Sequence, residues 1–176
     1  MDLSPSRSSV AEEHMTIPFT HLRVASGYSL QYGASHPSAL VERAVELGMD
    51  ILALTDRDGL YGAVRFAKHC LRTGVRPVIG TDLAVTATLP VATERSRTPV
   101  RGGTLRDPRH PRVVVLATSR TGWASLCRLI TATHLGGERG TPIATCDLVS
   151  RHGADVMVML GPDSELGRAL AADRVD

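Results

Sequence analysis

Two aspartates and an arginine follow an apolar run, and their spacing is typical of a functional site. Residues 51–62 read ILALTDRDGLYG, so a strand-like segment leads into Asp56, Arg57 and Asp58 and then into a glycine turn that starts a helix. Active sites of parallel α/β folds collect at such strand ends. Two carboxylates could bind a metal ion there, but the guanidinium between them has no lone pair to offer. A guanidinium between two carboxylates is therefore an unusual arrangement for a metal site.

The composition is that of a globular domain with one core. The chain has 176 residues, 43% of them apolar and 22% charged, which is enough for one well-packed domain. The apolar runs at 113–117 and 156–160 are strand-sized and too short to span a membrane. The polar start lacks the apolar core of a secretion signal, so we expect a cytoplasmic protein without a membrane partner. Its three cysteines fit neither a disulfide framework nor a zinc motif.

Hydrophobic periodicity predicts alternating strands and helices after a disordered leader at 1–18, so that residues 19–176 form the domain. Helices are predicted at about 37–48, 60–72, 121–134, 147–151 and 164–172. Strands are predicted at 19–25, 51–55, 75–80 with a continuation over 83–88, 112–118 and 156–160. Repeated strand and helix segments with crossover helices argue for a parallel α/β sheet or barrel with about five or six strands.

Apolar spacing also predicts which side chains are buried. One helix is expected to bury a face made of Val64, Ala67 and Leu71, and a later helix a face made of Trp123, Cys127, Ile130 and His134. Phe19, Phe66 and Trp123 are expected in the core. Only 3% of the chain is aromatic, and no stripe of exposed rings for stacking single-stranded nucleic acid is visible in the sequence.

A basic segment separates the two halves of the chain. Residues 89–112 carry six arginines against Glu94 and Asp107, and the part at 89–111 contains four prolines and paired glycines. This part is predicted to be a flexible insertion, because it is too long and polar for a tight connection. Its arginines are candidate contacts to nucleic acid, namely Arg95, Arg97, Arg101, Arg106 and Arg109. The alternative is a general preference for arginine, since Lys68 is the single lysine among 20 basic residues.

Three blocks of the sequence resemble a known family: FTHLRVASGYSLQYGA, LALTDRDGLYGAVRFA and PVIGTDLAV. They are similar to the N-terminal PHP (polymerase and histidinol phosphatase) domain of bacterial DNA polymerase III alpha-type subunits, above all the error-prone, translesion branch. The similarity continues through VVVLATSRTGWASLCRLITATHLGGERGTP and covers roughly residues 19–160. It implies a distorted (β/α)7 barrel, here truncated, whose strand ends hold zinc, manganese or iron for phosphoester hydrolysis.

The resemblance also implies where metal ligands should stand, and most of those positions hold unsuitable side chains. The histidine pair of the family falls on Arg23 and Ala25, and its acidic loop ligand falls on Tyr32. A further histidine falls on Arg57, and a glutamate falls on Asp82. His21 lies two residues before the pair and is expected to be a buried or second-layer histidine. Metals for hydrolysis need imidazole or carboxylate donors at about 2.0–2.2 Å, which a guanidinium cannot supply.

We therefore expect no catalytic residue and no resident metal, with Asp56 and Asp82 as the remaining metal candidates. Asp58 completes the set of vestigial positions. Carboxylates gathered to hold cations would repel one another once the cations are gone, and buried charges require partners. Arg57 and Arg23 are predicted to supply the missing positive charge by pairing with Asp56, Asp58 or Asp82.

Three functions remain open from the sequence. The first is a degenerate PHP segment of an error-prone, polymerase III alpha-like protein, inactive by itself, with a structural or partner-docking role. Its partners would be the remaining polymerase polypeptide or replication and repair subunits, and DNA would be contacted indirectly. The magnesium-dependent core of the polymerase is not expected within these 176 residues. The second is a small free-standing metal-dependent phosphoesterase that uses Asp56, Asp58, Asp82 and His21. The third is a relic of a split polymerase gene without a stable fold.

Overall fold

The structure is a computed structural model of the chain, and it describes residues 19–88, 110–137 and 140–172. The leader predicted at 1–18 lies outside the described residues, as does nearly all of the basic insertion predicted at 89–111. The five arginines proposed to contact nucleic acid belong to that part. No helix in the described ranges is long and apolar enough to cross a membrane.

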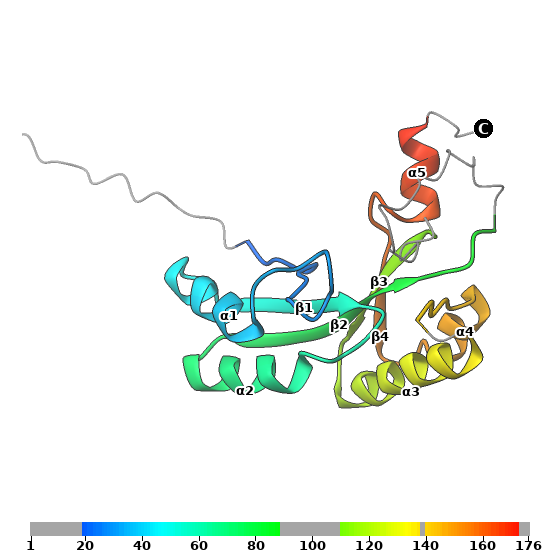
Figure 1. Ribbon diagram of the computed structural model, residues 1–176. Coiled ribbons are helices and arrows are strands. Elements are labelled where there is room, and N and C mark those ends of the chain that lie inside the picture. The colour runs from blue at the N-terminus through cyan, green and yellow to red at the C-terminus, as the bar shows by residue number, and fades with distance from the viewer. Residues whose placement is uncertain (1–18, 89–109, 138–139, 173–176) are drawn as a thin grey trace, which may run out of the picture.

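The described residues form a four-stranded sheet with the order β1-β2-β3-β4, which Figure 1 shows as a strongly twisted layer. Its strands are β1 (Ile51–Arg57), β2 (Arg76–Ala84), β3 (Arg112–Ala117) and β4 (Val156–Met159). Only β1 and β2 are parallel, whereas β2 with β3 and β3 with β4 are antiparallel. The prediction of a parallel sheet with five or six strands is therefore wrong for the described residues, and a full barrel is not seen there.

The helices between the strands account for the direction of β2 relative to β1 and of β4 relative to β3. One crossover helix returns the chain to the starting edge of a sheet and makes the next strand parallel, as α2 (Ala63–Thr73) does between β1 and β2. Two helices, α3 (Arg120–Gly136) and α4 (Cys146–Arg151), separate β3 from β4. The second helix brings the chain back to the end at which β3 finished, so β4 runs antiparallel.

Two apolar clusters lie side by side on one face of the sheet. In Figure 1, α1 (Pro37–Glu46) and α2 lie along β1 and β2, while α3 and α4 lie along β3 and β4. The first cluster contains Val41, Ala44, Leu52, Leu54, Phe66, Cys70 and Val75. The second contains Leu83, Val85, Val113, Val115, Leu126, Leu129 and Ala144. The last helix, α5 (Glu165–Ala171), has no buried residue. The second cluster reaches Leu83 near the carboxyl end of β2, next to the polar side chain of Asp82.

The predicted strand at 19–25 is not a strand. Its backbone runs beside β1, where the carbonyls of His21 and Val24 accept hydrogen bonds from the N–H groups of Ala53 and Thr55. The N–H of Val24 then bonds to the Thr55 hydroxyl at 2.9 Å instead of a backbone carbonyl. The Thr55 hydroxyl takes the place of a backbone carbonyl as the acceptor, so the pairing with β1 is irregular.

The predicted buried faces of two helices are also wrong, because the structure buries a neighbouring face of each helix. In α2 the buried residues are Ala63, Phe66 and Cys70, whereas Val64 and Leu71 are 61% and 77% exposed. In α3 the buried residues are Gly122, Ser125, Leu126, Leu129 and Thr133. A Cβ at Gly122 would collide with the carbonyl oxygen of Asp155. Small residues let a helix approach its neighbours closely, so in each of these helices the buried face is the one that contains them.

Candidate functional site

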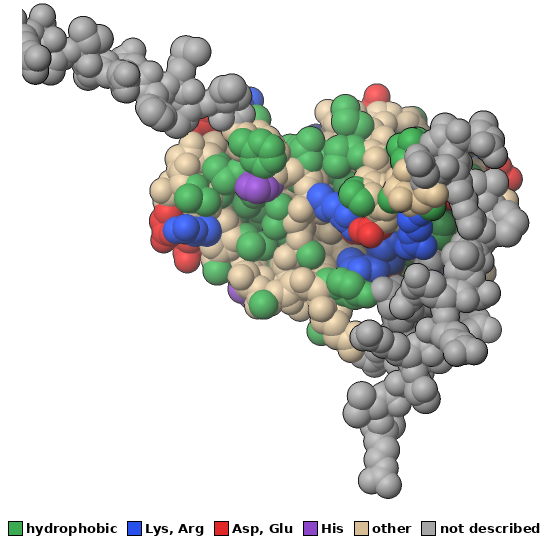
Figure 2. All heavy atoms as spheres, turned by 90° about the horizontal axis from the view of Figure 1, so that it is seen from above, with side chains coloured by type: hydrophobic (Ala, Val, Ile, Leu, Met, Phe, Trp, Pro, Cys, Tyr) green, Lys and Arg blue, Asp and Glu red, His purple; other side chains and the backbone are tan. Residues whose placement is uncertain are grey.

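The candidate site lies at the carboxyl ends of β1 and β2, where three segments bring charged side chains together. Asp56 and Arg57 close β1, and Arg57 is the register partner of Asp82 on β2. Because β3 runs antiparallel to β2, its first residue, Arg112, starts at this same edge, opposite Ala84. Seen from above, basic side chains surround acidic ones on this face of the molecule (Figure 2).

Arg112 is the central cation of the site. Its side chain is 7% exposed and donates hydrogen bonds to the Asp82 carboxylate at 2.6 Å and the Asp58 carboxylate at 2.9 Å. It also donates to the Asp82 carbonyl oxygen at 2.6 Å. Burial by itself lowers the pKa of Arg112, but the fields of Asp58 and Asp82 and their hydrogen bonds outweigh it, so the net pKa is raised. The guanidinium is thus a permanent charge that holds two carboxylates together.

Arg23 binds the other side of the same carboxylate. It donates to Asp82 Oδ2 from two nitrogens, at 3.0 and 2.8 Å, and to the Asp163 carboxylate at 2.5 Å. The predicted pairing of Arg23 with Asp82 is confirmed. The hydrogen bond from Arg23 and, more weakly, its charge lower the pKa of Asp163. The N–H of Arg112 donates to the Asp163 carbonyl oxygen, so this network also fastens the segment before α5 to the sheet.

Asp56 is held by hydroxyls and a backbone amide. It is 1% exposed, and its Oδ1 accepts the Ser26 N–H at 2.7 Å and the Ser29 hydroxyl at 2.7 Å. The Ser26 hydroxyl lies 2.9 Å from both carboxylate oxygens. A Cβ at Gly62 would lie 2.8 Å from Asp56 Oδ2, so that side of the carboxylate is closed by backbone. Asp56 is a buried structural anion whose oxygens already have donors.

Asp58 shapes the turn between β1 and α2. Its backbone has a positive φ of 51°, a left-handed conformation that aspartate tolerates better than most residues. Its N–H donates to the Asp82 carbonyl, and its carboxylate accepts the Ala84 N–H at 2.9 Å. His134 Nε2 lies 2.6 Å from the Asp58 carbonyl oxygen. The turn is therefore tied to both β2 and the end of α3.

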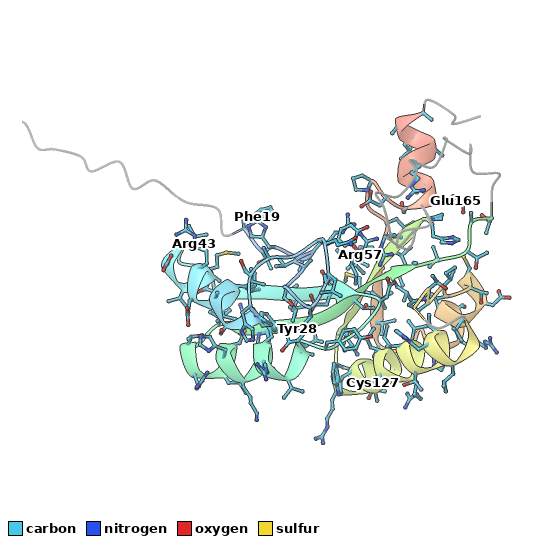
Figure 3. The ribbon with its side chains drawn as sticks, in the orientation of Figure 1. Phe19, Tyr28, Arg43, Arg57, Cys127 and Glu165 are labelled. Atoms are coloured by element: carbon cyan, nitrogen blue, oxygen red, sulfur yellow. The ribbon has the colours of Figure 1, made fainter. Side chains whose placement is uncertain are left out.

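A pocket of about 330 Å³ opens beside this charged network. Its lining includes Tyr28, Tyr32, Arg57, Tyr61, Arg112 and His134. The guanidinium carbon of Arg57 lies 3.5 Å from the centroid of the Tyr32 ring, a cation–π distance. Tyr28 comes from the loop before α1 and Arg57 from the end of β1 (Figure 3).

The donor set does not fit the divalent metal that the resemblance implies. His21 is exposed, against the expectation of a buried histidine, and its ring packs edge-on against Phe19. Phe19 is itself 70% exposed and not a core residue. Ala25 has no ligand atom. Throughout the described ranges, no three His, Cys, Asp or Glu side chains are grouped so that they could hold a metal ion. Guanidinium groups lie between the carboxylates, and their charge repels a divalent cation.

Sequence reasoning missed several members of the site. Arg112 was placed at the start of a strand but not in the site, because the strand's direction was predicted wrongly. Asp163, Ser26 and Ser29 reach the site only through the fold. The one available signal was chemical: buried carboxylates require donors, and a strand that begins with arginine can supply them.

Comparisons with known proteins agree with the resemblance. The family model described as "PHP domain" matches residues 21–176. An error-prone DNA polymerase of Mycobacterium bovis is 44% identical over 128 residues, which are 72% of this chain and 11% of that protein. The error-prone DNA polymerase of Nocardia farcinica is 36% identical over 150 residues, covering 71% of this chain and 13% of that protein. The chain thus spans only about a tenth of these relatives' length.

Solved structures show more distant likeness. An amidohydrolase from Chromobacterium violaceum superposes with a TM-score of 0.46 at 21% identity, over 66% of this chain and 34% of the other. The family model, by contrast, extends across nearly the whole described sequence, from residue 21 onward, and includes every residue of the charged network. By this match, the chain belongs to the PHP domain family.

Proposed function

We propose that this PHP domain is a metal-free scaffold of an error-prone, polymerase III alpha-like protein and no longer a phosphoesterase. The observation that carries the proposal is the position of Arg112, a buried guanidinium hydrogen-bonded to both Asp58 and Asp82. The proposal includes a role in DNA replication or translesion repair in the cytoplasm, and the relatives named error-prone DNA polymerase support the polymerase context.

The charged network supports the absence of a resident metal. A divalent ion between Asp58 and Asp82 would have to displace Arg112 and leave that buried guanidinium without its carboxylate partners, which is strongly unfavourable. The third carboxylate, Asp163, is engaged by Arg23. Hydrolysis by enzymes of this kind needs a metal that lowers the pKa of bound water. Without a metal, water at this site keeps its ordinary high pKa.

The same network supports a scaffold role. It joins the segment before α1 through Arg23, strand β2 through Asp82, strand β3 through Arg112 and the segment before α5 through Asp163. Such a cross-link does mechanically what a bound metal does in a metal site, because it fixes several segments to one charged centre. We infer that the domain keeps its shape in order to support the remaining polymerase polypeptide or an accessory subunit.

Metal analysis combined with an activity assay tests the proposal. The purified chain is incubated with manganese or zinc, dialysed, and measured by mass spectrometry for bound metal and with p-nitrophenyl phosphate for turnover. The expected result is substoichiometric metal and no hydrolysis above the protein-free rate. A variant with Arg23→His, Ala25→His, Tyr32→Asp and Arg57→His restores the donor types that the family pattern requires and serves as the comparison. Stoichiometric metal with turnover in the parent would favour the phosphoesterase alternative.

Thermal unfolding separates the scaffold from a relic of a split gene. A scaffold with one core is expected to unfold in one cooperative transition, as most small single domains do. A broad, non-cooperative melting curve would favour the relic. Reading the DNA that flanks the coding region for the rest of an alpha-type subunit tests whether a polymerase partner is encoded nearby.

A further inference from the structure

The outer face of α2 carries an apolar stripe that the fold leaves uncovered. Val64 and Leu71 lie about two turns apart on this helix and are 61% and 77% exposed. Ala67 lies between them on the same face. In Figure 1, α2 is at the outside of the molecule, and no other helix or strand of the described ranges lies beyond it. The helix turns a different stripe to the core, namely Ala63, Phe66 and Cys70. One helix thus has two apolar stripes, and the core buries only one of them.

Basic side chains accompany the exposed stripe. Residues 61–76 contain no carboxylate and have a charge of +4, so the net charge of +2 for the whole chain leaves −2 for the rest. Lys68 follows Val64 by one helical turn and precedes Leu71 by another, so it lies on the stripe itself. All four cations are exposed, and they are Arg65, Lys68, Arg72 and Arg76. Within the described part of the chain, none of the four forms an ion pair with a carboxylate.

The contacts that two of these arginines make do not neutralise their charge. Arg65 donates to His36 Nε2 at 3.3 Å, and Arg72 donates to His69 Nδ1 at 2.8 Å. An imidazole that accepts a hydrogen bond at one of its nitrogens is a neutral ring. The Glu42 carboxylate of α1 lies 3.4 Å from His69 Nε2 and pairs with none of the four cations. The face therefore combines uncovered apolar side chains with a net positive charge.

This combination decides between three classes of partner. The phosphates of a nucleic acid would meet the cations, but they offer nothing apolar to cover Val64 and Leu71. A second copy of the chain could cover the stripe, but it would bring four like charges against the first four. An acidic amphipathic helix satisfies both features, because its apolar side chains cover the stripe and its carboxylates meet the cations.

We propose that the outer face of α2 docks an acidic amphipathic helix of a partner polypeptide. Docking buries Val64 and Leu71 against apolar side chains that recur at helical spacing, while neighbouring carboxylates pair with Lys68 and the adjacent arginines. The stripe from residue 64 to residue 71 is about 10 Å long, so about two turns of the partner contact it and the affinity is modest.

This docking surface deepens the proposed scaffold function and rests on it, because it names the face and the chemistry with which the domain holds a partner. The helix α2 contributes no residue to the charged network around Arg112. Metal binding and peptide binding are therefore measured at separate places, and either assay can fail while the other succeeds.

Nuclear magnetic resonance titration of the full, isotope-labelled chain tests the proposal with a designed peptide. The peptide is an acidic helix with leucines on one face and glutamates beside them, and its comparison is a peptide of the same composition in scrambled order. The expected result is a saturable shift of the amide signals of residues 61–76. The scrambled peptide should bind at least about fivefold more weakly, and added salt should weaken the binding of the acidic helix.

The other occupants are outcomes of the same experiment. Tighter binding of an oligothymidylate than of the acidic helix would identify a nucleic-acid surface. Sedimentation that shows self-association, lost in Leu71→Ser, would identify a contact between two copies. Either result overturns the proposal, as does the absence of any shift in residues 61–76 at saturating peptide.

Matched variants locate the contact. Leu71→Ser removes one apolar side chain and Lys68→Glu reverses one charge, and each is expected to weaken peptide binding at least about fivefold. Comparable changes on α3 are Leu135→Ser, at a leucine that is 83% exposed, and Arg128→Glu, at an exposed arginine. These two should leave the affinity unchanged, and an equal loss in them would overturn the proposal. Circular dichroism confirms that each variant is folded, and Val64→Ser tests the same stripe if Leu71→Ser fails to fold.

Discussion

Replacing Arg112 with methionine should be among the most destabilising single changes in this domain. The side chain is 7% exposed and its nitrogens donate to the carboxylates of Asp82 and Asp58. Hydrogen bonds to charged groups contribute about 1.5–3 kcal/mol each, and removing one partner of a buried ion pair costs about 3–5 kcal/mol. Arg23 still binds Asp82 from the other side, which offsets part of the loss. We expect Arg112→Met to lower the free energy of unfolding by about 3–5 kcal/mol.

Urea denaturation followed by circular dichroism measures this loss. The midpoint should fall while the slope of the transition stays constant, because the variant unfolds the same surface. Arg43→Ala is the matched control, since Arg43 pairs with Glu46 at 2.8 Å but both side chains are more than 60% exposed. An exposed pair of this kind contributes only about 0.3–0.5 kcal/mol.

A double-mutant cycle tests the cause of the effect. Asp82→Asn removes the charge that Arg112→Met leaves behind, so Asp82→Asn should be less destabilising in the Arg112→Met background than in the parent, with a coupling of at least about 1 kcal/mol. If Arg112→Met were no more harmful than Arg43→Ala, or if the two changes were simply additive, the guanidinium would not hold the site together and the electrostatic argument for the scaffold would be refuted.

Three further predictions concern other groups. Ser29→Ala removes a hydroxyl that donates to Asp56 at 2.7 Å, so it should lower the free energy of unfolding by about 1.5–3 kcal/mol in the same urea assay, and no measurable loss would contradict this role. The pKa of Asp163 is lowered from its ordinary 3.8 by its arginine partner. Its stabilisation is therefore present above about pH 4 and is lost as the pH falls through the lowered pKa. The stability difference between the parent and Asp163→Asn should disappear at acidic pH, and a constant difference would show that the charge is irrelevant. Burial raises the pKa of the Cys70 thiol to about 11, so a thiol reagent at pH 8 should label exposed Cys146 quickly and Cys70 only after unfolding, as mass spectrometry of the peptides can show.

Local patterns in the sequence were enough to locate most elements and the position of the site. Four strands and five helices were predicted close to their observed bounds, because apolar periodicity, proline at the start of α1 and glycine at the end of α2 act over a few residues. The site was predicted at the end of β1 because an apolar run followed directly by charged residues is typical of a buried strand that ends at a polar edge. The argument that an arginine cannot act as a metal ligand also depends only on residue types.

Directions, faces and partners were decided by the tertiary structure. Whether β3 runs parallel or antiparallel depends on how the connecting chain returns, and this determines that Arg112 meets Asp82. The buried stripe of α2 depends on which side chains pack closely against the sheet, and Phe66 was selected over Val64 and Leu71.

The same division holds for the site itself. Its residue types predicted that the carboxylates need a cation as partner, and that cation comes from a strand that begins 54 residues after Asp58 and 30 residues after Asp82. Likewise, three scattered tyrosines became one pocket only after the loop and the turn that carry them were brought together. Contacts between distant segments depend on the packing of the whole core, which no local sequence pattern records. The sequence therefore predicted that a cation pairs with the carboxylates, but it did not identify that cation as Arg112.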